Sequence, residues 1–236
     1  MEVVIKNNVE VVFTAAGHPG KFIDKLKSSG AKVVHVVSSV KFAKKAESVG
    51  VDAIVGEGVE AGGHNGLDET TTLSLIPQLV NEVNIPVIAA GGIATGNQIL
   101  AALSLGAEGV QIGTAFAATK ESSMHQVYKD KVIEAGDNST MLILKKVGMA
   151  RVIKSPFAEK VLQSELAGAD EERLRTLLGK KKEMLGMFEG DFEHGMLEAG
   201  QSSGLVNKLL SVDEYFEKII NEMSTSFTRI KKSVSL

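Results

Sequence analysis

A glycine-rich segment with a single histidine, GEGVEAGGHNG at residues 56–66, offers the clearest chemistry in this sequence. It follows the apolar run AIV at residues 53–55, which has the character of a buried strand. Glycine lets the backbone approach a ligand closely, and an imidazole can accept or donate a proton near neutral pH. His64 is therefore a candidate catalytic acid or base. The alternative is a structural histidine that fixes the loop.

Two further glycine loops follow later apolar runs. AGGI at residues 90–93 and QIGT at residues 111–114 each come directly after a strand-like run. Backbone amides at the start of a helix favour an anion, and two such loops on adjacent strands are typical of the phosphate site in many βα barrels. Both loops are therefore candidate phosphate-binding segments. Gly91 and Gly92 could instead form only a tight turn.

Five short runs rich in valine and isoleucine must carry these loops, and each has the composition of a strand buried on both faces. They span residues 9–15, 32–38, 52–56, 85–90 and 109–113. Helical patterns lie between them at 21–28, 40–49, 70–83 and 97–105, so the sequence predicts an α/β fold with a parallel sheet. Because parallel βα units connect with one hand, one rim should hold the strand ends at Thr14, Ser38, Glu57, Gly91 and Gly113.

Five strands are enough for an open doubly wound sheet but are three short of an eight-stranded βα barrel. Glycines at three successive strand ends favour the barrel, because an open sheet binds ligands at one crevice. From residue 119 onward the pattern is helical, most clearly at 159–167, 170–178 and 212–223. We expect a partial barrel over residues 1–118 and a helical appendage over 119–236, whose last helix returns to the barrel.

Composition excludes several other classes of protein. The 236 residues carry a formal net charge of -3 and their basic residues are dispersed. The chain therefore lacks the clustered basic residues of a nucleic-acid-binding protein. The absence of cysteine excludes disulfides, thiolate catalysis and iron–sulfur clusters, and no histidine pair has carboxylates at a metal-binding spacing. No stretch approaches the roughly 20 apolar residues of a membrane span. We therefore expect no metal, no membrane contact and a cytoplasmic location.

Five motifs in order along the chain support a more specific interpretation. EGVEAGGHNG, IPVIAAGGIATG, GAEGVQIGTAF, KESSMHQVYKDKV and GQSSGL together resemble the nitronate monooxygenase family, formerly called 2-nitropropane dioxygenases. The close relative of that family, the flavin-dependent enoyl-acyl-carrier-protein reductase, is similar too. The resemblance implies an FMN-binding TIM-type (β/α) barrel, here incomplete with five parallel βα units, and a helical C-terminal segment.

The resemblance also implies roles for individual residues. His64 matches the active-site histidine of the family. Glu57 and Gly62 would lie along the flavin, and Gly91 and Gly92 would approach its phosphate. The phosphate cradle would be completed by Gln111, Ile112, Gly113 and Thr114.

The implied activity is FMN-dependent oxidation of alkyl nitronates by oxygen, which yields a carbonyl compound and nitrite. The nearest alternative is an enoyl-acyl-carrier-protein reductase that uses NADH and FMN on an enoyl thioester, and Glu57 and the GQSSGL segment favour it. A third interpretation is an inactive flavin-binding fragment. The expected partners are the small-molecule substrate and oxygen, with a homodimer possible.

Two departures from the family pattern stand out. Relatives commonly read GTRF after the last barrel strand, whereas Ala115 replaces the arginine here. The family's first three βα units, which include contacts to the flavin, have no counterpart. From sequence we therefore expect a truncated chain. Part of the flavin ring would have no protein contacts, so the chain would bind FMN poorly.

Overall fold

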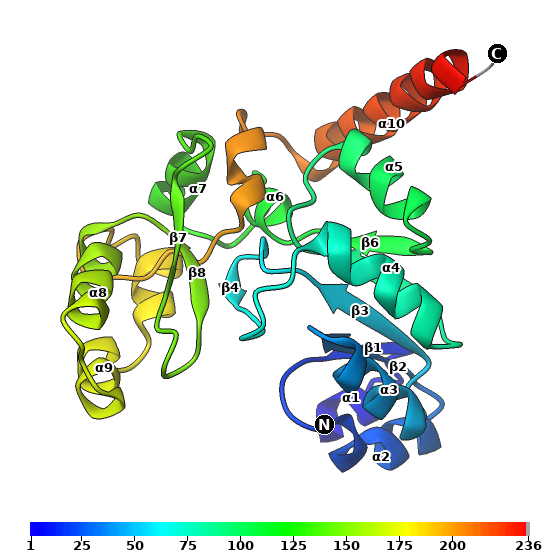
Figure 1. The fold of residues 1–236 in the computed structure, drawn as a ribbon, viewed down its shortest axis with the longest axis horizontal. Coiled ribbons are helices and arrows are strands. Elements are labelled where there is room, and N and C mark those ends of the chain that lie inside the picture. The colour runs from blue at the N-terminus through cyan, green and yellow to red at the C-terminus, as the bar shows by residue number, and fades with distance from the viewer. Residues whose placement is uncertain (235–236) are drawn as a thin grey trace.

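The computed structural model describes residues 1–234, and its main element is a five-stranded parallel sheet in the order β1-β2-β3-β5-β6 (Figure 1). The strands are β1 (Val11–Thr14), β2 (Lys32–Val37), β3 (Ala53–Glu57), β5 (Val87–Ala90) and β6 (Gly109–Gln111). Every neighbouring pair is parallel and follows chain order. The predicted α/β sheet with its carboxyl ends on one rim is confirmed, and the sheet curls as an incomplete TIM-type barrel.

Helices precede or connect the strands and cover the outer face of the sheet. They are α1 (Glu2–Lys6), the short 3-10 turn η1 (Pro19–Lys21), α2 (Ile23–Ser28), α3 (Val40–Ser48), α4 (Thr72–Glu82) and α5 (Gly96–Ser104). Two have clear start signals: the Ser39 hydroxyl caps α3, and Thr95 and Gln98 form a capping box at α5. Fully buried Ile54, from the sheet, and Leu79, from α4, belong to the core that joins both layers.

The remaining chain is mostly helical, but it also contains two strands that the sequence analysis missed. Its helical elements are α6 (Thr114–Ala117), α7 (Gln126–Ile133), α8 (Pro156–Leu166), α9 (Glu171–Leu178), the π-helical turn η2 (Met184–Phe188), the 3-10 turn η3 (Gln201–Leu205) and α10 (Val212–Val234). The predicted helical segment also contains an antiparallel hairpin, which β7 (Thr140–Ile143) and β8 (Ala150–Ile153) form. Each has only four residues, which is too short to display a strand period. A domain division at residue 118 stays a prediction.

The hairpin reaches back to the first half of the chain. β4 (Gly63–His64) pairs with β8 and completes a three-stranded antiparallel sheet. The segment that follows Glu57 is therefore held by a strand almost ninety residues later. None of the described helices is both long and apolar enough to cross a membrane.

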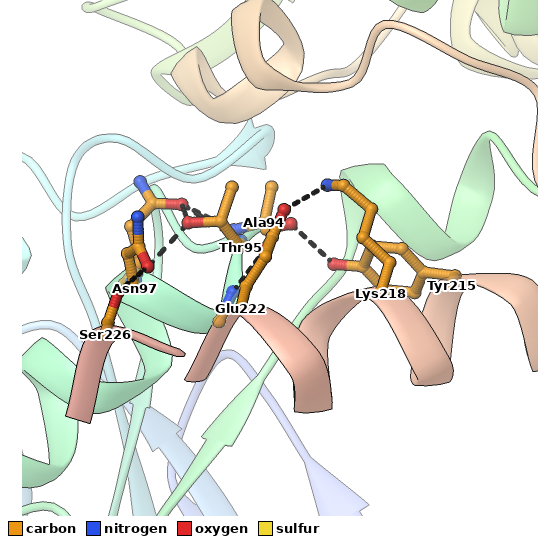
Figure 2. A network of polar contacts seen from close by, with 9 residues as sticks. Ala94, Thr95, Asn97, Tyr215, Lys218, Glu222 and Ser226 are labelled. Carbon is orange, nitrogen blue, oxygen red and sulfur yellow. Dashed lines mark hydrogen bonds and ion pairs between the residues drawn. The ribbon is translucent and has the colours of Figure 1, made fainter. Parts of the chain in front are cut away.

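The last helix, α10, lies against α5 and the loop before it (Figure 2). The Tyr215 hydroxyl donates to the Ala94 carbonyl at 3.0 Å, and the Gly96 amide donates to the Glu222 carboxylate at 2.9 Å. Ser226 and Asn97 are hydrogen-bonded through their side chains. α10 therefore fixes the start of α5, and with it the loop that follows β5.

Contact between α5 and α10 leaves no space for a side chain at Gly96. A Cβ there would lie 2.2 Å from the Ile219 carbonyl oxygen and 2.4 Å from the Met223 nitrogen. We predict that Gly96→Ala lowers the free energy of unfolding by roughly 1–3 kcal/mol, because backbone atoms of α10 must move. Urea denaturation followed by circular dichroism measures the change. The control is Gly109→Ala, where nothing lies within 4 Å of the added carbon; equal midpoints for the two variants would contradict the prediction.

Candidate active site

A pocket of about 230 Å³ lies where β3, β5 and β6 end. Every predicted cofactor residue except Ile112 lines it, namely Glu57, Gly62, Gly91, Gly92, Gln111, Gly113 and Thr114. Ile112 is partly buried and packs against the apolar clusters behind the strand. Its neighbours Gln111 and Gly113 face the pocket, as the two-residue period of an extended chain requires. The structure thus brings the two predicted phosphate loops to one cavity.

The glycine loops present backbone rather than side chains to this pocket. Gly91 and Gly92 have φ values of +94° and +72°, which L side chains rarely adopt, and a Cβ on Gly91 would meet the Gly58 carbonyl oxygen at 2.7 Å. Gly113 has open space where its Cβ would stand. Among residues 1–234, no acceptor takes the backbone amides of Gly92 and Gly113. Such exposed amides suit an anion.

The segment that contains η3 closes one side of the pocket and was not expected there. The Thr114 hydroxyl oxygen accepts a hydrogen bond from the Gly200 amide at 2.9 Å, so its own hydrogen is left to donate. A Cβ on Gly62 would lie 2.6 Å from the Ala199 carbonyl carbon. This close approach of two backbones is a sufficient reason for glycine at position 62, independent of any bound ring.

His64 faces a second, larger cavity of about 490 Å³ rather than the glycine-loop pocket. His18, His35 and Asn65 also line this cavity, and Glu57 lines both cavities. The structure therefore places Glu57 between the predicted phosphate loops and the predicted active-site histidine. One elongated ligand that bridges the two cavities would pass this carboxyl group.

Pairing with the hairpin positions His64. His64 stands opposite Ala150 in the β4–β8 ladder, and the Asn65 amide donates to the Met149 carbonyl at 2.9 Å. The imidazole is 69% exposed, and its Nδ1 lies 3.6 Å from Oε1 of Glu198. A carboxylate at this distance can orient the ring.

Two carboxyl groups in the pocket are poorly solvated. Burial raises the pKa of Glu57 to about 7, from an ordinary value of 4.5. Burial also raises the pKa of Glu198, and the nearby His64 opposes this shift. No lysine or arginine of the described chain lines the pocket. An anion would therefore be held by backbone amides, with Glu57 available in its neutral form near pH 7.

Several pocket residues come from the second half of the chain and escaped the sequence reasoning. Tyr128 is buried and donates its hydroxyl hydrogen to the Glu198 carbonyl at 2.9 Å, and Met187, Glu198 and Ser202 complete the wall. Tyr128 and Ser202 lie within the quoted motifs KESSMHQVYKDKV and GQSSGL. The motifs were therefore a signal for these two residues, but only the fold shows which side chains reach the site.

Comparison with known proteins agrees with this arrangement. The family model described as nitronate monooxygenase matches residues 1–222. The chain belongs to the nitronate monooxygenase family. A probable nitronate monooxygenase of Staphylococcus aureus strain Newman is 39% identical over 175 residues, which cover 70% of this chain and 49% of that protein. The chain thus spans about half the length of the curated relatives it matches.

Two solved structures are also similar. FabK from Thermotoga maritima superposes with a TM-score of 0.93 at 39% identity, over 99% of this chain and 74% of that chain. A nitroalkane oxidase from Streptomyces ansochromogenes superposes with a TM-score of 0.79 at 29% identity, over 97% of this chain and 68% of that one. Membership of the family and the incomplete TIM-type fold, both expected from the motifs, are confirmed.

The raised pKa of Glu57 has a consequence for stability. Between about pH 4.5 and pH 7 the side chain is ionised in the unfolded chain but protonated in the folded one, so its contribution to stability falls as pH rises through this range. We predict that Glu57→Gln removes this loss, roughly 1–3 kcal/mol between pH 5 and pH 7.5. Urea unfolding of both proteins at the two pH values measures it. Parallel pH profiles would show that Glu57 is not desolvated.

Proposed function

We propose that the protein is an FMN-dependent oxidoreductase that oxidises alkyl nitronates with oxygen, releasing a carbonyl compound and nitrite. The observation that carries the proposal is the order of groups along the rim. Glycine loops with free amides line the smaller cavity, and the exposed imidazole of His64 lines the larger one. Glu57 lines both cavities. This order suits a cofactor with a phosphate at one end and a reactive ring at the other.

The glycine-loop pocket fits the phosphate of FMN. The amides of Gly92 and Gly113 and the hydroxyl hydrogen of Thr114 would donate to its oxygens, and the space beside Gly113 is open. Gly91 and Gln111 would complete the lining. When bound, FMN would accept electrons from the substrate and pass them to oxygen.

His64 would act on the substrate from the larger cavity. As an imidazolium it would hold the negatively charged nitronate oxygens, and as a neutral base it would remove the α-proton of a nitroalkane. Glu198, at 3.6 Å from Nδ1, would keep the ring oriented so that its other nitrogen faces the substrate. A role for His64 in fixing the loop alone remains the alternative interpretation.

Reduction of an enoyl thioester by NADH and FMN is the second candidate function. Glu57 favours it, because a carboxyl group with a pKa of about 7 can donate a proton to the α-carbon while hydride adds to the β-carbon. The GQSSGL segment, whose Gly200 and Ser202 line the pocket, agrees with this alternative. The two candidates differ in what reduces the flavin.

Anaerobic stopped-flow measurement of flavin reduction separates the candidates. With FMN supplied below the chain concentration, because the chain is expected to retain it poorly, we expect an alkyl nitronate to bleach the flavin absorbance rapidly and NADH to do so slowly. Rapid reduction by NADH with none by nitronates would overturn our first choice in favour of the enoyl reductase. A yellow protein that neither reagent reduces would indicate an inactive flavin-binding chain.

His64→Ala tests the catalytic role of the imidazole. In the FMN-loaded protein we predict a turnover on a neutral nitroalkane at least ~100-fold lower, because a positioned base contributes roughly 10²–10⁴-fold, while bound FMN stays constant. The matched control is His194→Ala, which removes another exposed histidine beside a carboxylate, Asp191. Equal turnover of the two variants would assign His64 a structural role.

A further inference from the structure

The loop that follows β5 separates two cavities. Residues 91–93 line the pocket of the candidate site on one side and a second cavity of about 370 Å³ on the other. We call this second space the rear cavity. Its wall includes the polar side chains of Glu60, Thr72 and Gln98, none of which lines the candidate pocket. The glycine loop is therefore contacted from behind by groups that do not line the site in front.

Both glycine carbonyls of the loop bond to these rear groups. The Thr72 hydroxyl oxygen lies 2.9 Å from the Gly91 carbonyl oxygen, and the Gln98 side-chain amide donates to the Gly92 carbonyl. All peptide bonds of the described chain are trans, and in a trans peptide the C=O and the N–H point in opposite directions. A rear hydrogen bond to the Gly91 carbonyl therefore turns the Gly92 amide toward the pocket in front.

The Thr72 hydroxyl has one hydrogen and three acceptors within reach. Besides Gly91, they are the Ala90 carbonyl and Oε2 of Glu60, each at 3.1 Å. The Ala90 carbonyl already accepts from the Gly58 amide at 3.0 Å, and the Glu60 oxygen already accepts from the Thr72 amide at 2.9 Å. Within residues 1–234 no other donor reaches the Gly91 carbonyl. Because an unpaired carbonyl is costly, we assign the hydroxyl hydrogen to Gly91.

We propose that Thr72 is a positioning residue for the phosphate site: its hydroxyl selects the orientation of the peptide between Gly91 and Gly92 that presents the Gly92 amide to a phosphate ester. The inference rests on the proposed binding of FMN, but it does not depend on which substrate the flavin oxidises. Something must select this orientation, because neither glycine has a Cβ to restrict its backbone. In the reversed orientation the Gly91 carbonyl oxygen would face the anion and repel it.

Thr72 is itself firmly held. It is the first residue of α4, it is 8% exposed, and its amide donates to both carboxylate oxygens of Glu60, at 2.9 and 3.1 Å. Glycines leave room for its hydroxyl, since an added Cβ would lie 2.2 Å from Oγ1 at Gly58 and 2.9 Å from it at Gly91. A hydroxyl enclosed in this way stays against the loop.

Binding of FMN and of riboflavin, measured by flavin fluorescence, tests the proposal. Riboflavin has the same ring but no phosphate, so the ratio of the two dissociation constants cancels any loss of contacts to the ring. Thr72→Val removes the hydroxyl at nearly constant volume. We expect it to raise the dissociation constant of FMN by roughly tenfold or more, because a hydrogen bond to a charged group is lost, and to leave that of riboflavin unchanged.

Two variants serve as controls. Thr72→Ser retains the hydroxyl and should retain most of the FMN affinity. Thr71→Val changes the preceding threonine, which is exposed and makes no capping bond to α4, and should bind both flavins as the unmodified chain does. Circular dichroism reports whether each variant folds, and Thr72→Ala replaces the valine variant if that one does not.

A second measurement follows the Gly92 amide without flavin. In the chain labelled with ¹⁵N-glycine, we expect inorganic phosphate to shift the NMR signal of the Gly92 amide and the Thr72→Val substitution to abolish this shift. The Gly168 amide should not respond, because it lies beyond the end of α8 and already donates to the Glu165 carbonyl at 3.0 Å.

Three results would overturn the proposal. Equal losses of FMN and riboflavin affinity in Thr72→Val would show that the hydroxyl supports the whole site rather than one amide. Unchanged FMN affinity in that variant would show that the peptide keeps its orientation without the hydroxyl. No response of Gly92 to phosphate or FMN in the unmodified chain would mean that no anion binds there. Failure of nitronate oxidation, with the flavin affinities as expected, would instead contradict the proposed function and support the role of Thr72.

Discussion

The candidate site depends on one close approach between two backbones. Gly62, in the loop after β3, and Gly200, before η3, leave no space for side chains: their Cβ atoms would lie 2.6 Å from the Ala199 carbonyl carbon and 2.7 Å from the Glu60 carbonyl oxygen. The Gln201 amide donates to that same Glu60 oxygen, and the Gly200 amide donates to Thr114. This contact joins the parallel sheet to the second half of the chain, and the pocket exists only where they meet.

The same contact helps to bury the carboxyl groups of the site. It brings Glu198 beside Gly63 and His64, where burial raises the pKa of the carboxyl group. Glu57 lies at the end of β3, where burial raises its pKa to about 7. Anion binding then depends on amides, whose partial charges do not neutralise the carboxyl groups. A site of this kind can hold an anion and a protonated carboxyl group at the same pH.

Local patterns predicted the sheet, but they could not predict what positions the histidine. The buried strands, the order of the units and the pocket-facing loops all follow from segments of ten to twenty residues. His64 is placed by β8, and the Ala150 opposite it is 86 positions away in a strand of four residues. Glu198 is farther still. Such long-range pairings produce no local hydrophobic periodicity from which they could be predicted. By contrast, the inward packing of Ile112 follows from strand alternation and could have been anticipated.

Helix α10 braces the candidate phosphate loop that follows β5. Tyr215 holds the Ala94 carbonyl, Gln98 accepts from the Ala94 amide, and the same Gln98 donates to the Gly92 carbonyl. Ala115 is buried in the same apolar cluster as Tyr215 and Ile219 of α10. Through Ala94 and Gln98, α10 therefore restrains the loop that contains Gly92.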